Sequence, residues 1–109
     1  MNVTDKLFSL DGRVAIISGG AGLLGRQHAG VIADAGGIAV IADVLEDQAV
    51  RAAEETAAAS GVQAMGIRVD VTSKSDVASM VAAVMKRFGK IDILINNAAM
   101  TVQGGSQSG

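Results

Sequence analysis

A glycine-rich segment near the start of the chain, Gly20-Ala-Gly22-Leu-Leu-Gly25, has the spacing G-x-G-x-x-G. Glycines at this spacing permit a tight turn and let the backbone approach a bound group closely. The segment lies between a predicted strand and a predicted helix, so the unpaired amides of the helix N-terminus could hold a pyrophosphate. The pattern favours a dinucleotide site, although a strand-to-helix turn without a ligand would use the same residues.

An acidic residue follows at the end of the next predicted strand, since Asp43 stands 18 residues after Gly25. Dinucleotide sites place an acid at about 20 residues to accept hydrogen bonds from the adenosine ribose. Its carboxylate would repel a 2′-phosphate, so we expect NAD in preference to NADP, and only Arg26 stands where it could pair with such a phosphate. The alternative is that Asp43 caps the following helix.

Four short apolar runs alternate with three helical segments. Residues 13–18, 38–42, 63–69 and 91–95 are predicted strands, and residues 23–35, 45–60 and the segment from Ser73 to Gly89 are predicted helices. Strands that alternate with helices of this length imply right-handed crossovers and a parallel sheet. The sequence therefore predicts an α/β fold, the first half of a Rossmann-like doubly wound sheet, with strand order 3-2-1-4 and helices on both faces.

Two of these helices carry recognisable patterns. In the first, Leu24, Val31, Ile32 and Ala35 repeat at helical spacing. The third opens with a capping-box pattern, Ser73-Lys-Ser-Asp76, and continues with one apolar stripe made of Val77, Met80, Val81, Val84 and Phe88.

Composition argues against several classes of protein. The net charge is −2 and charges of both signs alternate, so no basic face is available for nucleic acid. There is no Cys and a single His, which argues against a metal site. The first ten residues lack the apolar run of a secretory signal and no later stretch has membrane-spanning character, so we expect a soluble, cytoplasmic protein.

Three separated segments resemble the short-chain dehydrogenase/reductase family in order and spacing. They are Ser18-Gly-Gly-Ala-Gly-Leu-Leu-Gly25, Asp70-Val71 and Asn96-Asn-Ala-Ala99, so the resemblance extends to about Met100. The chain departs from the family's commonest pattern at Leu23, where that pattern has glycine. Ser18 also replaces the usual Thr, and Ala99 the usual Gly, which leaves the subfamily open.

The resemblance implies a cofactor role for nine residues. The loop residues Gly19, Gly22, Leu24 and Gly25 would surround the pyrophosphate, and Asp43 would hold the adenosine ribose. The carboxylate of Asp70 and the backbone of Val71 would contact the adenine edge, and the backbone of Asn96 and Ala98 would contact the ribose side. Asn97 would help to tie neighbouring strands together.

The same resemblance implies hydride transfer between a nicotinamide cofactor and an alcohol or carbonyl substrate. Family members use a Tyr as general acid/base, a Lys four positions later and a Ser, whereas this sequence contains no Tyr. We therefore expect a fragment without catalytic residues of its own, whose substrate would be bound by a C-terminal half. Its parts would be an extension (1–12), an NAD-binding half-domain (13–100) and a Gly/Ser-rich stub (101–109).

Two other functions stay open at this point. A non-catalytic NAD-binding or interaction module would have the same glycine loop and could pair its exposed sheet edge with a partner. A methyltransferase-like protein also binds an adenosine ribose on such a sheet, although the segment from Asn96 to Ala99 argues against it. Whichever function is right, the fourth strand would be an unprotected edge, so we expect a marginal or self-associating fold.

Overall fold

The computed structural model describes residues 9–97, which form one parallel sheet with helices between its strands. The strands are β1 (Val14–Ser18), β2 (Ile38–Asp43), β3 (Ala64–Arg68) and β4 (Ile93–Asn96). The helices are α2 (Leu23–Asp34), α3 (Glu46–Ser60) and α4 (Lys74–Phe88). The strand order is β3-β2-β1-β4 and every pair is parallel, which confirms the predicted topology.

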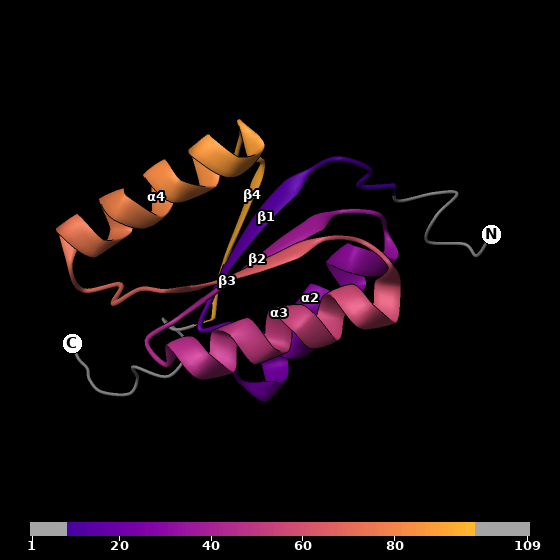
Figure 1. The fold of residues 1–109 in the computed structure, drawn as a ribbon, viewed down its shortest axis with the longest axis horizontal. Coiled ribbons are helices and arrows are strands. Elements are labelled where there is room, and N and C mark those ends of the chain that lie inside the picture. Colours follow the sequence, from indigo (N-terminus) through magenta and orange to yellow (C-terminus); the bar gives the residue numbers. More distant parts are fainter. Residues whose placement is uncertain (1–8, 98–109) are drawn as a thin grey trace.

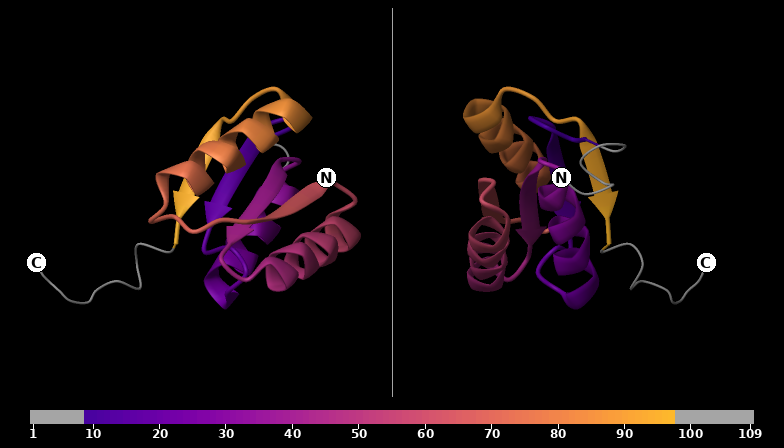
Figure 2. Two further views of the ribbon diagram at one scale, coloured as in Figure 1. Left: turned by 60° about the vertical axis from the view of Figure 1, so that its left-hand side comes forward. Right: turned by 90° about the vertical axis from the view of Figure 1, so that its right-hand side faces the viewer.

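Helices cover both faces of the sheet, as the sequence predicts. In Figure 1, α2 and α3 lie below the sheet and α4 lies above it. Every residue of β1 is buried because this strand has a neighbour on each side and helices on both faces. Figure 2 shows β4 at one margin of the sheet, next to β1.

Small side chains fill the contact of α2 and α3 with the sheet. The strand residues Ala15 and Ala39 meet the helix residues Ala29 and Ala49 in one buried cluster. Leu10, which precedes β1, packs against the same cluster. A Cβ on Gly66 of β3 would lie 2.5 Å from the backbone oxygen of Ala49, so α3 and β3 are in direct backbone contact at this point.

Two of the apolar residues that predicted α2 do not face the core. The exposed fractions of Leu24 and Val31 are 46% and 62%, whereas Ile32 and Ala35 are buried. At Leu24 the reason is the close approach of the helix to the preceding turn, since a Cβ on Gly25 would lie 2.4 Å from Cα of Gly20. Only small residues fit on the side of the first turns that faces the sheet, and the larger ones point away.

Within residues 9–97, α4 is the helix that packs against the opposite face of the sheet. Met80 and Val84 of α4 are buried against Val14 and Val40 of the sheet. Val81, which the sequence places on the same stripe, is 38% exposed and lines a groove of about 260 Å³ beside β4. Leu94 of β4 lines this groove as well and is 67% exposed.

Side chains and backbone groups join β4 to β1 at both ends. Asp92 accepts a hydrogen bond from the backbone N–H of Val14 at 2.9 Å, and Ser18 Oγ donates to Asn96 Oδ1 at 2.8 Å. The strand begins at Ile93 and not at residue 91, since Asp92 meets Val14 partly through its side chain. Within residues 9–97 no helix has the length and apolar character needed to cross a membrane.

Candidate functional site

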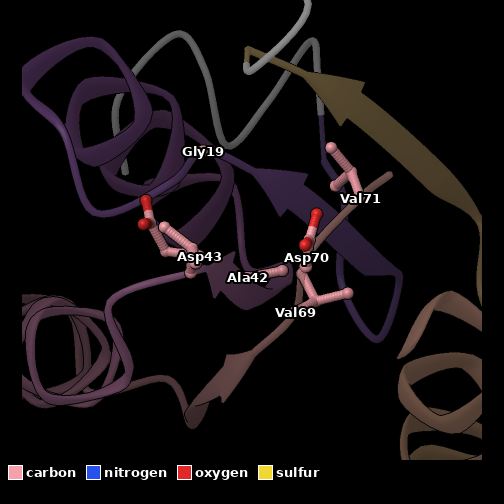
Figure 3. A pocket seen from close by; sticks show the side chains of 7 residues that line it. Gly19, Ala42, Asp43, Val69, Asp70 and Val71 are labelled. Carbon is pink, nitrogen blue, oxygen red and sulfur yellow. The ribbon is translucent and has the colours of Figure 1, made fainter. Parts of the chain in front are cut away.

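A pocket of about 270 Å³ lies at the carboxyl ends of the first three strands (Figure 3). It is lined by residues at the end of β2 and by residues just after β1, β2 and β3: Gly19, Ala42, Asp43, Val44, Val69, Asp70 and Val71. Four of the nine predicted cofactor residues therefore meet here. Two carboxylates lie on its wall, and most of the remaining lining is aliphatic.

The glycine loop borders this pocket through Gly19. The structure requires glycine at some positions of the loop and not at others. Gly19 has a φ of 68°, a conformation that L side chains rarely adopt. A Cβ on Gly20 would lie 2.7 Å from the backbone oxygen of Ile17. At Gly22, φ is −76° and a Cβ would come no closer than 3.9 Å to the protein. Neither packing nor backbone conformation requires glycine at Gly22.

The N-terminus of α2 has unpaired amides next to this loop. Gly22 is the N-cap and supplies no side-chain cap, and the first turn contains no acidic residue. The helix's first bond is donated by the N–H of Arg26 to the carbonyl of Gly22 at 2.9 Å. The N–H groups of Leu23, Leu24 and Gly25 have no partner within residues 9–97, so they are available to an anion.

Asp43 connects the end of β2 to the glycine loop. Its Oδ2 accepts a hydrogen bond from the N–H of Ala21, and its Oδ1 accepts one from the N–H of Leu45, each at 3.2 Å. The N-cap of α3 is Leu45 and not Asp43, so the capping alternative is wrong in its strict form. Both oxygens keep further lone pairs, with which they could accept hydrogen bonds from ribose hydroxyls.

Arg26 is already engaged within the protein. Its Nε donates to the carbonyl oxygen of Ala21 at 3.0 Å, and its guanidinium pairs with Glu55 of α3. The peptide groups of Ala21 are thus held by Asp43 through the N–H and by Arg26 through the carbonyl. Arg26, the residue that could pair with the 2′-phosphate of NADP, is therefore already paired with an acidic side chain.

Asp70 is oriented by its own turn. Its Oδ1 accepts hydrogen bonds from the N–H of Thr72 at 2.9 Å and from Oγ1 of Thr72 at 2.6 Å. These bonds hold the pKa of Asp70 below its usual range, so the carboxylate is ionised at neutral pH. Sequence reasoning missed Thr72, although Asp followed two positions later by Thr is a recognisable turn pattern.

Asn96 and Asn97 do not line this pocket. Asn96 accepts a hydrogen bond from the hydroxyl of Ser18, and the N–H of Asn97 donates to the carbonyl of Ser18 at 3.0 Å. These contacts join the ends of β1 and β4, and the backbone of Asn97 takes part. Ala98 lies outside the described residues. No group of His, Cys, Asp or Glu in the described part of the chain is arranged to hold a metal ion.

Comparison with known proteins gives consistent results. A family model described as short chain dehydrogenase matches residues 13–108. The chain is 36% identical over 100 residues to the short chain dehydrogenase/reductase astE of Aspergillus oryzae, an alignment that covers 92% of this chain and 38% of that protein. The methyltransferase alternative is wrong on this evidence.

Solved structures agree with the family match. A hydroxysteroid dehydrogenase from Escherichia coli superimposes with a TM-score of 0.78 at 34% identity, over 85% of this chain and 39% of that one. An NADPH-dependent 3-quinuclidinone reductase from Rhodotorula rubra gives a TM-score of 0.77 at 31% identity, over 86% of this chain and 35% of that one.

The chain therefore spans between a third and two fifths of the length of these relatives. Its strand order is the one expected for a Rossmann-like sheet, and the family model matches all but the first twelve residues and the last. The chain belongs to the short-chain dehydrogenase/reductase family, whose members are oxidoreductases that bind nicotinamide cofactors.

Proposed function

We propose that this chain holds the adenosine half of NAD(H), and that the whole protein is an NAD-dependent oxidoreductase acting on an alcohol or carbonyl substrate. The observation that carries the proposal is the meeting of a glycine loop and two carboxylates, Asp43 and Asp70, around one pocket. When bound, the cofactor would supply or accept the hydride. The residues of this chain would bind and orient it.

The residues fit such a group. The free amides at the start of α2 would bind the pyrophosphate, and Asp43 would accept hydrogen bonds from the ribose hydroxyls. An adenine ring is flat and largely apolar with one exocyclic amine, which suits a wall made of Val71 and the ionised Asp70. Gly22 supports the proposal independently, because nothing in the protein itself requires glycine there.

A substitution at Gly22 tests whether the loop binds a ligand. Gly22→Ala should leave the melting temperature close to that of the wild type, since there is room for the Cβ, but should weaken NADH binding about 10-fold by keeping the pyrophosphate away from the backbone. Gly30→Ala is the matched control, because its Cβ also meets open space, on the middle of α2. Unchanged NADH affinity in Gly22→Ala would favour a turn without a ligand.

The choice of NAD over NADP rests on Asp43 and on the Arg26–Glu55 pair. In fluorescence titrations we expect NADH to bind at least about 10-fold more tightly than NADPH. Glu55→Gln would free Arg26 to pair with a 2′-phosphate, so it should raise the affinity for NADPH about 2- to 5-fold and have little effect on the affinity for NADH. The expected change is small because an exposed ion pair contributes little free energy. Equal affinities in the wild type would contradict the preference.

Catalysis is proposed for the whole protein and not for these 109 residues, because the sequence contains no Tyr. The coding sequence, read in frame beyond Gly109, distinguishes the two remaining functions. A further strand followed by Ser and Tyr-x-x-x-Lys would support the oxidoreductase. Their absence would favour the non-catalytic NAD-binding module.

A further inference from the structure

The turn after β3 forms one wall of the pocket and presents a single free carboxylate oxygen. Oδ1 of Asp70 accepts both hydrogen bonds from Thr72, and Oδ2 has no partner within residues 9–97. The direction in which this oxygen points is fixed by the turn. Whatever holds the turn therefore determines which hydrogen-bond donors the pocket can recognise.

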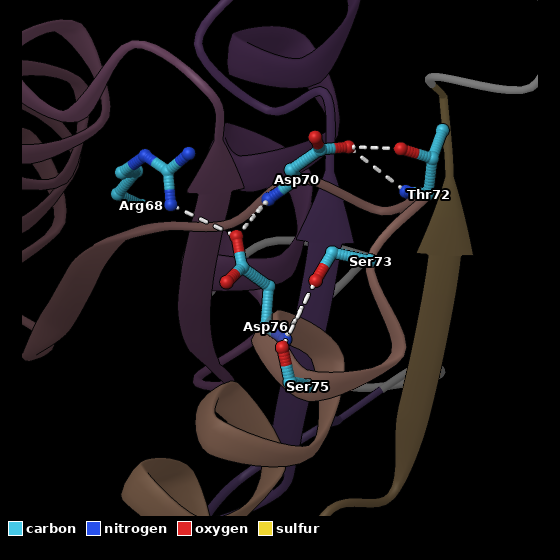
Figure 4. A network of polar contacts seen from close by, with 6 residues as sticks. All are labelled: Arg68, Asp70, Thr72, Ser73, Ser75 and Asp76. Carbon is cyan, nitrogen blue, oxygen red and sulfur yellow. Dashed lines mark hydrogen bonds and ion pairs between the residues drawn. The ribbon is translucent and has the colours of Figure 1, made fainter.

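Asp76, in the first turn of α4, holds that turn from outside the pocket. Its Oδ2 accepts a hydrogen bond from the backbone N–H of Asp70 at 3.0 Å and pairs with Nη1 of Arg68 at 2.8 Å (Figure 4). The end of β3, the turn and the start of α4 are thus joined at one oxygen atom. Asp76 itself does not line the pocket.

The carboxylate of Asp76 does not complete the capping box that the sequence predicts. Half of the box is present, because the N–H of Asp76 donates to Oγ of Ser73 at 3.2 Å. In a full box the acidic side chain would accept from the N–H of Ser73. That N–H instead donates to the carbonyl of Asp70 at 2.9 Å, and the Asp76 carboxylate binds the N–H of Asp70. Two backbone groups of Asp70 are therefore held by the start of α4.

We propose that Asp76, supported by Arg68, is a positioning residue that makes the pocket selective for a base with an exocyclic amine. It does so by fixing the turn that aims the free oxygen of Asp70. A carboxylate accepts a hydrogen bond from the 6-amine of adenine, but it faces an oxygen at the same position of hypoxanthine. The inference rests on the proposed function, since it concerns the adenosine part of the same dinucleotide.

The test compares NADH with its hypoxanthine analogue, reduced nicotinamide hypoxanthine dinucleotide, by fluorescence titration of the full chain. We expect the wild type to favour NADH by about 10-fold, the size of one hydrogen bond to a charged group, and Asp70→Ala to abolish this preference. Asp76→Ala should reduce the preference at least about 3-fold, and Asp76→Asn should retain most of it, because the amide oxygen can still accept from the N–H of Asp70.

Ser73→Ala is the matched control for helix stability. It removes the side-chain N-cap of α4, which lowers the stability of that helix, and leaves the bonds from Asp76 to Asp70 and Arg68 in place. We expect it to retain the preference for NADH. If Asp76→Ala does not fold, Arg68→Gln is the substitute, since it removes one partner of the same oxygen from a half-exposed position and should reduce the preference by a smaller factor.

Four results would overturn the inference. In the first, Asp76→Ala keeps the wild-type preference for NADH while Asp70→Ala loses it. In the second, Ser73→Ala loses as much of that preference as Asp76→Ala does, which would make Asp76 only a helix-stabilising residue. A wild type that binds both dinucleotides equally would also overturn it, while leaving the proposed function intact. A wild type that binds neither would overturn the proposed function and this inference together.

Discussion

In the described part of the chain, two helices cover one face of the sheet and one helix covers the other, and the side chains at the two contacts differ in size. Alanines such as Ala29, Ala49 and Ala52 bring α2 and α3 close to the strands, whereas α4 packs through Met80 and Val84. The first contact holds the glycine loop against the strand ends. The second leaves a groove of about 260 Å³ beside β4. Close packing and the glycine loop thus occur together on the face covered by α2 and α3.

The largest expected effect comes from truncating one buried side chain on each face. Ile41→Ala and Met80→Ala should both destabilise the protein, within the range of about 2–5 kcal/mol for such changes. We expect Ile41→Ala near the upper end, because the alanine-rich face cannot collapse around the void. Met80 already lines the groove, so its loss should lie near the lower end. Urea unfolding measures both, and equal costs would argue that the faces are packed alike.

The close approach of α3 to β3 can be tested with a single methyl group. Gly66→Ala should destabilise the protein by about 1–3 kcal/mol, because its Cβ would lie 2.5 Å from the backbone oxygen of Ala49. Gly30→Ala should instead stabilise it by about 0.5–1 kcal/mol, since its Cβ meets open space in the middle of α2. Thermal melts of the two variants should shift in opposite directions, and a harmless Gly66→Ala would show that α3 can move away.

The attachment of β4 to β1 should depend on pH. The hydrogen bond from the N–H of Val14 lowers the pKa of Asp92, so its carboxylate contributes stability above the unfolded value of about 3.9. This contribution is lost as the pH falls through the lower folded value. The wild type should therefore exceed Asp92→Asn in stability at neutral pH, and the gap should close below about pH 4.

Asp34→Asn is the control for this pH series, because the side chain of Asp34 is exposed and makes no hydrogen bond or ion pair within residues 9–97. It controls for the general effect of replacing one exposed aspartate by asparagine. A gap between the wild type and Asp92→Asn that persists unchanged at pH 2 would contradict the role of Asp92.

The smallest expected effect on stability is at the open groove. Leu94→Thr should change the free energy of unfolding by no more than about 0.5 kcal/mol, since the side chain is 67% exposed. If copies of the chain associate through the sheet edge at β4, as we expect from the sequence, the same substitution should weaken that association in sedimentation velocity. Val31→Thr, at a similarly exposed apolar position on α2, controls for surface polarity. A wild type that is monomeric at all concentrations would reject the association.

The sequence predicted the topology correctly because each strand is a short apolar run that stops at a glycine or a polar residue. It could not orient α2, since periodicity alone does not reveal that Gly25 lies against Gly20. Four of the expected cofactor residues line one pocket, because the sequence places each of them at or just after the end of a predicted strand. The partners of Asp76 and Arg26 could not be predicted, because a local sequence pattern does not show contacts formed across a turn or between helices.

The uneven cover of the sheet also bears on local unfolding. With no second helix beside it among residues 9–97, α4 should open from the sheet more readily than α2 or α3, and its amides should exchange with solvent sooner. The turn that carries Asp70 is joined to the start of this helix through Asp76. A dinucleotide bound against this turn would therefore slow hydrogen exchange along α4, although it would not contact the middle of that helix.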